Sequence, residues 1–188
     1  MSIRPTREEA WALLNEYTKT EYLLKHAQAV EGVMRYYAHY LKEEDAEKWA
    51  LVGLLHDLDY DMYPDQHCIK VSEILRERQV DEAIIRSIVS HGYKHTVDVK
   101  PEHVMEKVLY ATDELCGLIH ACAIMRPSKS VMDLEPKSVK KKFKTLNFAA
   151  GVSRDTIEEG VAMLGWELDD VIHHTILALR EVSEEIGL

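Results

Sequence analysis

Residues 50–57 read ALVGLLHD and residues 58–64 read LDYDMYP, and this junction organises the interpretation of the whole chain. An apolar helical run ends in His56 and Asp57, and the acidic residues and Pro64 that follow cannot extend it as a buried helix. Imidazole and carboxylate are the two commonest metal ligands other than thiolates. A pair at the end of a buried helix lies at the floor of a pocket, so the junction predicts a metal site. The alternative is a last helical turn that contains His and Asp by chance.

The chain has 188 residues, 46% of them hydrophobic, and a formal net charge of −10. That length and hydrophobic fraction are enough for one sizeable core, so we expect a single domain over residues 1–188. A chain this acidic lacks the basic face that nucleic acids and acidic membranes require, so we expect neither as a partner. No pattern in the sequence indicates an oligomeric state.

Cysteine usage and the N-terminus indicate the compartment. Cys68, Cys116 and Cys122 form no CxxC pair and are typical of small apolar residues in a reducing environment. The N-terminus has no signal-peptide pattern, and no apolar run approaches about 18 residues. The sequence therefore predicts a cytoplasmic protein.

Hydrophobic residues recur at helical spacing along nearly the whole chain, and alternating strand patterns are missing. The prediction is an all-α bundle of about eight to nine helices, with a metal-binding core over about 20–125 and C-terminal helices over about 137–188 packed on it. Thr6 and Glu9 fit a capping box that opens the first helix. The other helices are expected over about 20–41, 43–56, 65–79, 81–91, 101–126, 137–150, 153–164 and 169–186.

Four further residues carry imidazole or carboxylate on apolar helix faces. His26 lies at the edge of an apolar stripe, where a hydrogen-bonded packing residue is the alternative. His67 is expected in the first turn of a helix opened by Asp65, and His91 at the end of the next helix, where a dipole-stabilised cap is the alternative. Asp113 interrupts an apolar stripe, which is unfavourable unless a cation compensates it.

Together these residues come from five helical segments and share an inward position. One common cause, a metal centre in the core of the bundle, explains them better than six separate ones. Four imidazoles and two carboxylates suit one octahedral ion with ligands to spare, or two ions that share a carboxylate; the metal could be Fe, Mn, Co, Ni, Zn or Mg. The predicted ligands are His26, His56, Asp57, His67, His91 and Asp113.

This ordered set resembles the HD-domain superfamily of metal-dependent phosphohydrolases over roughly residues 20–125. His26 is similar to its first histidine, His56–Asp57 to its namesake doublet and Asp113 to its final aspartate. His67 and His91 are similar to the extra histidines of dinuclear members. Gly92 stands where the larger cyclic-dinucleotide phosphodiesterases have a second histidine, so that activity is not expected.

The residues after the doublet depart from the family. Leu58-Asp59-Tyr60 stands where many members have Ile-Gly-Lys, which weakens the inference of phosphate binding there. Asp59 and Asp61 are instead predicted, with Asp57, to be catalytic, either by orienting a ligand or by transferring a proton. Loop solvation and helix capping are the alternative roles for both.

A local excess of basic residues follows the predicted core. Arg126, Lys129, Lys140 and Lys144 are predicted to form a rim that attracts a phosphorylated substrate, and the alternative is the solvated face of a helix. His95 is interpreted as a loop residue, and His173 and His174 as surface or packing residues.

The resemblance implies a hydrolase in which a metal activates water against a nucleotide or another small phosphate ester. Asp57 would bridge two ions, one held by His26, His56 and Asp113, and the other by His67 and His91. Two alternatives stay open. One is a di-iron oxygenase of the same superfamily, similar to myo-inositol oxygenase, and the other is a non-catalytic binding module that a metal stabilises.

Overall fold

The computed structural model describes residues 2–188, and over this range the protein is all-helical, with no strand beyond two isolated bridges. The predicted fold class is confirmed: residues 2–188 form nine α-helices of eight residues or more, one four-residue helix and two 3₁₀ turns. The elements are α1 (Arg7–Tyr17), α2 (Glu21–Tyr40), α3 (Ala46–Leu55), η1 (Pro64–Gln66), α4 (Lys70–Glu77), α5 (Glu82–Val89), η2 (Ser90–Gly92), α6 (Val104–Ile124), α7 (Pro136–Phe143), α8 (Arg154–Leu164), α9 (Leu168–Glu181) and α10 (Ser183–Ile186).

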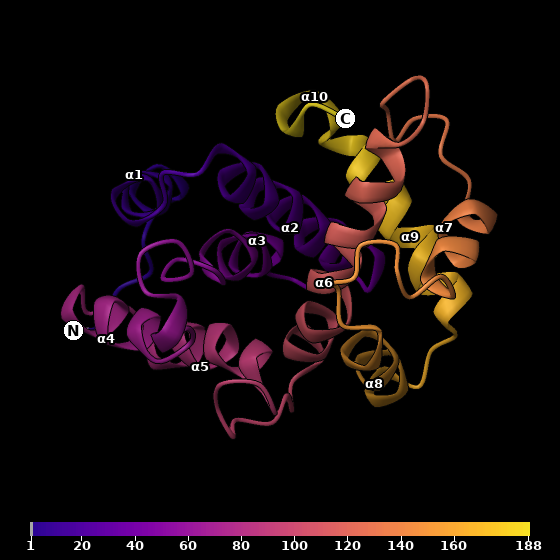
Figure 1. Cartoon of the computed structure of the whole chain (residues 1–188). Helices are drawn as coiled ribbons and strands as arrows, with labels where there is room; N and C mark the ends of the chain where they lie inside the picture. The colour runs from indigo at the N-terminus through magenta and orange to yellow at the C-terminus, as the bar shows by residue number, and fades with distance from the viewer. Residues whose placement is uncertain (1) are drawn as a thin grey trace.

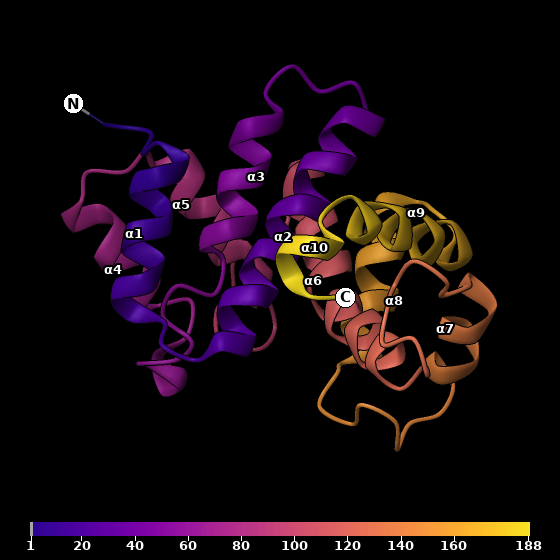
Figure 2. The same ribbon diagram turned by 90° about the horizontal axis from the view of Figure 1, so that it is seen from above.

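Three helices form the centre of the molecule. α2, α3 and α6 lie between α1, α4 and α5 on one side and α7, α8 and α9 on the other (Figures 1 and 2). One hydrophobic core cluster contains residues from Ala10 in α1 to Ile186 in α10, so the last helices bury their apolar faces on the same core as the first.

Two glycines allow the central helices to approach their neighbours closely. A Cβ atom at Gly53 would lie 2.7 Å from the carbonyl oxygen of Val30, so α3 can cross α2 this closely only with glycine there. A Cβ atom at Gly160 would lie 2.6 Å from Cα of Ala111, which sets the same requirement where α8 meets α6. The first contact brings the end of α3 to the face of α2, and the second fixes α8 against α6.

Helix starts follow their capping residues. Thr6 forms the predicted capping box with Glu9, and Ser153 accepts a hydrogen bond from the backbone amide of Thr156 at the start of α8. The prediction near Pro101 is wrong, because α6 begins at Val104 with His103 as its N-cap.

Three other predicted helices differ from those observed. The helix expected over 65–79 begins at Lys70, because the chain forms a 3₁₀ turn at Pro64–Gln66 and then a left-handed residue at Cys68, φ +66°. α7 ends at Phe143, so the loop that follows it reaches Gly151. The last expected helix is divided at Val182 into α9 and α10.

Candidate metal centre

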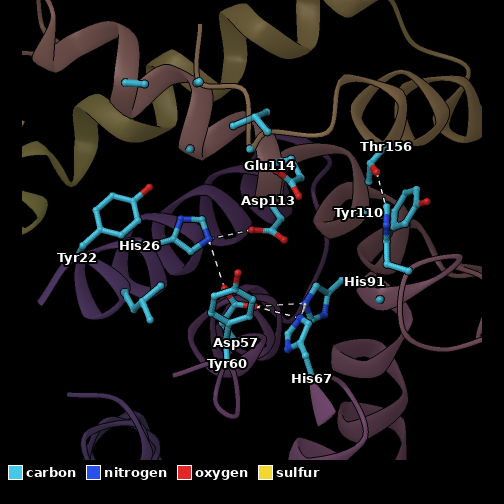
Figure 3. Close-up of a pocket in the computed structure, with 18 residues that line it drawn as sticks. Tyr22, His26, Asp57, Tyr60, His67, His91, Tyr110, Asp113, Glu114 and Thr156 are labelled. Atoms are coloured by element: carbon cyan, nitrogen blue, oxygen red, sulfur yellow. Dashed lines mark hydrogen bonds and ion pairs between the residues drawn. The ribbon is translucent and has the colours of Figure 1, made fainter. Parts of the chain in front are cut away.

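The six predicted ligands come together on one side of the central helices. His26 projects from α2, His56 and Asp57 directly follow α3, and Asp113 projects from α6, while His91 lies in η2. His67 lies in the irregular segment between η1 and α4, not in a helical turn as predicted. Figure 3 shows Asp57 at the centre, with His26 and Asp113 on one side and His67 and His91 on the other.

The first group of donor atoms contains His26, His56, Asp57 and Asp113, with one atom of each within 4.8 Å of the others. His56 Nε2 lies 3.2 Å from Asp57 Oδ2 and 3.2 Å from Asp113 Oδ1. His26 Nε2 lies 2.9 Å from Asp113 Oδ1 and 3.8 Å from Asp57 Oδ2. Two imidazoles and two carboxylates are a donor set that divalent transition metals accept.

The second group faces the other oxygen of Asp57. His67 Nε2 lies 3.5 Å and His91 Nε2 lies 3.4 Å from Asp57 Oδ1, and the two Nε2 atoms are 3.1 Å apart. Asp57 therefore presents Oδ2 to one group and Oδ1 to the other. That is the position of a carboxylate that two ions could share.

The opposite ring nitrogen of three histidines is held by an acceptor. Nδ1 of His56 donates to the Gly53 carbonyl at 2.7 Å, and Nδ1 of His91 donates to the Ile88 carbonyl at 2.5 Å. Nδ1 of His67 donates to Asp59 Oδ1 at 2.7 Å. Because carbonyl and carboxylate oxygens accept, each neutral ring carries its hydrogen on Nδ1, and each Nε2 keeps a lone pair for a metal.

Two features test whether these residues fit a metal ion. His56 is fully buried, and its Nε2 is a buried nitrogen without a hydrogen-bond partner among the described residues. Such an atom is unfavourable unless something satisfies it. The Nε2 lone pairs of His67 and His91 face each other at 3.1 Å, so a proton or a cation has to lie between them. The donor set therefore fits a metal, and in its absence a proton must take part of that role.

The electrostatics of the groups follow from this crowding. Burial alone would lower the pKa of His56, but the carboxylates of Asp57 and Asp113 outweigh burial and raise it to about 10. Burial also lowers the pKa of His67, and its hydrogen bond to Asp59 raises it to about 9. Burial would raise the pKa of Asp57 and Asp113, yet the histidines, His56 foremost, hold both below the usual range. The site therefore retains protons on imidazole and negative charge on carboxylate when no metal is bound.

One cysteine adjoins the second group. Cys68 is buried, and its Sγ lies 3.8 Å from His91 Nε2, so His67, Cys68 and His91 form a second set that could hold a metal. The sequence predicts Cys68 only as a small apolar residue. Its position immediately after His67 was the signal that could have marked it.

The other predicted catalytic residues lie outside the donor groups. Asp59 is fully buried and accepts from His67 Nδ1 and, at 2.7 Å, from the Val71 amide, so it orients His67. Asp61 accepts from the amides of Lys19 and Thr20, directly before α2, and is not among the residues that line the cavity. These contacts favour the alternative of a capping role, and a catalytic role for Asp61 stays a prediction.

The predicted phosphate rim also lies elsewhere. Arg126 pairs with Asp133 at 2.9 Å, and Lys140 pairs with Asp169 at 2.5 Å. Neither these two nor Lys129 and Lys144 line the cavity above the metal ligands. Arg126 and Lys140 have acidic partners close to their own positions, so these contacts favour the alternative of a solvated face, and a phosphate-attracting rim stays a prediction.

Above the donor groups lies a cavity of about 440 Å³. Its wall contains polar and aromatic residues that sequence reasoning did not select: Tyr22, Tyr60, His95, Tyr110, Glu114 and Thr156. His95, interpreted as a plain loop residue, lies 2.8 Å through Nε2 from Thr156 Oγ1 of α8. Glu114 could have been found from its position next to Asp113, but no sequence pattern links His95 to Thr156.

The comparisons with known proteins agree with this geometry. The family described as HD domain matches residues 23–118, just over half of the chain, and this range contains all six predicted ligands. The chain belongs to the HD-domain family. HD domains form a superfamily of metal-dependent phosphohydrolases and bind divalent metals. No curated protein and no solved structure matches this HD-domain chain. None of the helices in residues 2–188 is both long and apolar enough to cross a membrane.

Proposed function

We propose that this HD-domain protein is a metal-dependent hydrolase of a small phosphate ester. The observation that carries the proposal is the position of Asp57 between two sets of imidazole Nε2 atoms, beneath a cavity of about 440 Å³. His26, His56, Asp57 and Asp113 would hold one ion, and His67 and His91 would hold a second with the other oxygen of Asp57. A cavity of this size is within the range that accepts a small organic ligand.

The chain's own residues prepare this site in three ways. The Gly53 and Ile88 carbonyls and Asp59 fix the histidine rings so that each Nε2 faces the donor groups. Asp57 and Asp113 provide the negative charge that keeps cations in the core. Bound there, a divalent ion would act as a Lewis acid on a phosphoryl group and lower the pKa of a bound water molecule towards neutrality.

The test begins with metal analysis of protein purified without oxygen, followed by phosphate release from a panel of phosphate esters. We expect divalent metal in the purified protein and release of phosphate from at least one ester, with loss of both in Asp57→Asn. A metal-loaded protein that releases no phosphate from any ester would contradict the proposal.

A second candidate is supported by the same position of Asp57. A carboxylate shared by two neighbouring metal sites, the position that Asp57 has here, is also the arrangement that a di-iron oxygenase uses. Oxygen uptake by the iron-loaded protein in the presence of a small organic substrate, without phosphate release from any ester, would favour this candidate over the hydrolase.

A further inference from the structure

The cavity wall combines apolar and aromatic surface with a few polar groups. Among residues 2–188, no lysine or arginine lines this cavity, whereas three carboxylates do: Asp57, Asp113 and Glu114. The remaining polar groups of the lining are tyrosine and threonine hydroxyls and histidine imidazoles, of which His26, His67 and His91 belong to the donor groups. Sites that bind several phosphates or additional carboxylates use arginine and lysine for this purpose, and this wall offers neither.

One buried cation next to the wall is already engaged. Arg154 at the start of α8 is buried, and its guanidinium donates to the backbone carbonyls of Ala149 at 2.6 Å and Val152 at 3.0 Å, and also to that of Phe148. These hydrogen bonds hold the loop whose residues Ala149, Gly151 and Val152 line the cavity. Arg154 therefore shapes the wall from behind and does not offer its charge to a ligand.

Glu114 is the acidic residue of the cavity that belongs to neither donor group. Its Oε2 accepts a hydrogen bond from the Ser153 amide at 3.2 Å, and it forms no ion pair with any described residue. Figure 3 shows it beside Asp113, away from His67. Two divalent ions would balance the charges of a phosphate dianion and of the two ligand carboxylates, but a second negative group on the ligand would share the cavity with Glu114 and find no lysine or arginine among its lining residues. As a carboxylate, Glu114 repels an anion, and no lysine or arginine among the lining residues offsets this repulsion.

We propose that the ligand of this cavity is a phosphate monoester whose organic part bears hydroxyl or amine groups and no negative charge, and that Glu114 enforces this choice. This inference rests on the proposed function and narrows it, because it excludes nucleoside diphosphates and triphosphates and esters of acids. Thr156 Oγ1, linked to His95 and at 2.7 Å to Ser153 Oγ, provides a neutral site for a ligand hydroxyl close to Glu114, which accepts from the amide of the same serine.

The experiment uses two esters that differ in one group. Glycerol 3-phosphate carries a hydroxymethyl group where 3-phosphoglycerate carries a carboxylate. Their phosphonate analogues, with a methylene in place of the bridging oxygen, are titrated calorimetrically into the metal-loaded protein, so that binding is measured without turnover. Phosphate release from the two esters is measured separately.

We expect the neutral analogue to bind about tenfold more tightly than the acidic one. Glu114→Gln should reduce this preference to less than about threefold, and Glu114→Lys should reverse it. Glu158→Gln is the matched control: this exposed residue of α8 forms no side-chain hydrogen bond or ion pair within residues 2–188, and its substitution should leave the preference unchanged. Metal content and circular dichroism establish that each variant is folded.

Equal binding of the two analogues to the wild type, or an unchanged preference in Glu114→Gln, would overturn the inference. Should Glu114→Lys lose its metal, Glu114→Gln decides alone. The expected preference among the analogues without phosphate release from either ester would support the inference and contradict the proposed function. Phosphate release from both esters at equal rates, with equal binding of the two analogues, would support the proposed function and contradict the inference.

Discussion

The floor and the wall of the cavity are built in different ways. The floor consists of four histidines and two aspartates, and three of the rings are fixed by an acceptor on Nδ1. The wall consists of aromatic rings, small residues and a few polar contacts between distant segments, such as His95 with Thr156. The floor lies within the residues that the HD-domain family matches, and Thr156 and the loop before it lie outside them. Under the proposed function, the floor would provide the chemistry and the wall would select the ligand.

Removing the shared carboxylate should have the largest effect. Asp57→Asn loses the negative oxygens that face both donor groups, so we expect metal content to fall below one ion per chain. Phosphate release should fall at least about a thousandfold. Metal analysis and ester turnover measure this, and Asp133→Asn, at an exposed ion pair away from the cavity, is the control. A folded Asp57→Asn protein with full activity would show that the floor residues do not take part in the reaction.

Proton competition should have the next largest effect. The pKa of His67 is raised to about 9 and that of His56 to about 10 in the metal-free protein, so a metal ion must displace protons below these values. Metal affinity should therefore rise with pH, by about tenfold per pH unit for each proton displaced, and level off above about pH 10. Calorimetric titrations in buffers of different ionisation enthalpy count the protons released.

The same shifts set the stability of the metal-free protein. A histidine whose pKa is raised in the folded state stabilises the folded protein. This stabilisation is complete below the unfolded pKa of about 6.5 and is lost as the pH rises through 9 to 10. The metal-free protein should thus melt at lower temperature at pH 9 than at pH 6.5, and the metal-loaded protein should not.

A metal affinity that is independent of pH between 6 and 8 would show that these histidines are not ligands.

Asp59 should have an intermediate effect, because it acts through His67. Asn in this place can still accept from the Val71 amide, but it would offer its amide group to His67 Nδ1 and so favour the hydrogen on Nε2. We expect the affinity of the second ion to fall about ten- to a hundredfold, with the first ion retained. If Asp59→Asn lowers thermal stability but leaves both affinities unchanged, Asp59 has only a structural role.

The wall should respond most weakly. Thr156→Val removes the hydroxyl that contacts His95 and Ser153 while keeping the shape of the side chain. We expect KM for a phosphate ester to rise roughly two- to tenfold, with kcat and metal content unchanged. Thr145→Val, at an exposed threonine outside the cavity, is the matched control. A loss of metal in Thr156→Val would show that floor and wall are not separate.

The floor could be predicted from the sequence because each ligand interrupts an apolar pattern. Asp113 lies in the core stripe of α6, and His56 ends the buried run of α3, so their inward positions follow from periodicity. His67 was selected for the wrong reason: a 3₁₀ turn and the left-handed Cys68 place it, not a helical face.

The wall could not be predicted, because its contacts join segments that are far apart in the chain. His95 meets Thr156 across 61 residues, and only the packing of α8 on α6 brings them together. The predicted rim stays a prediction for a related reason. Arg126 and Lys140 carry charges that acidic neighbours neutralise, and composition alone cannot show which acid lies nearby.

The central claim is that Asp57 serves two metal ions, and metal stoichiometry tests it most directly. Wild-type protein loaded with Fe or Mn should bind close to two ions per chain, and His67→Ala and His91→Ala should each reduce this towards one while circular dichroism shows an intact fold. A wild-type stoichiometry of one under excess metal, unchanged by either substitution, would contradict the claim.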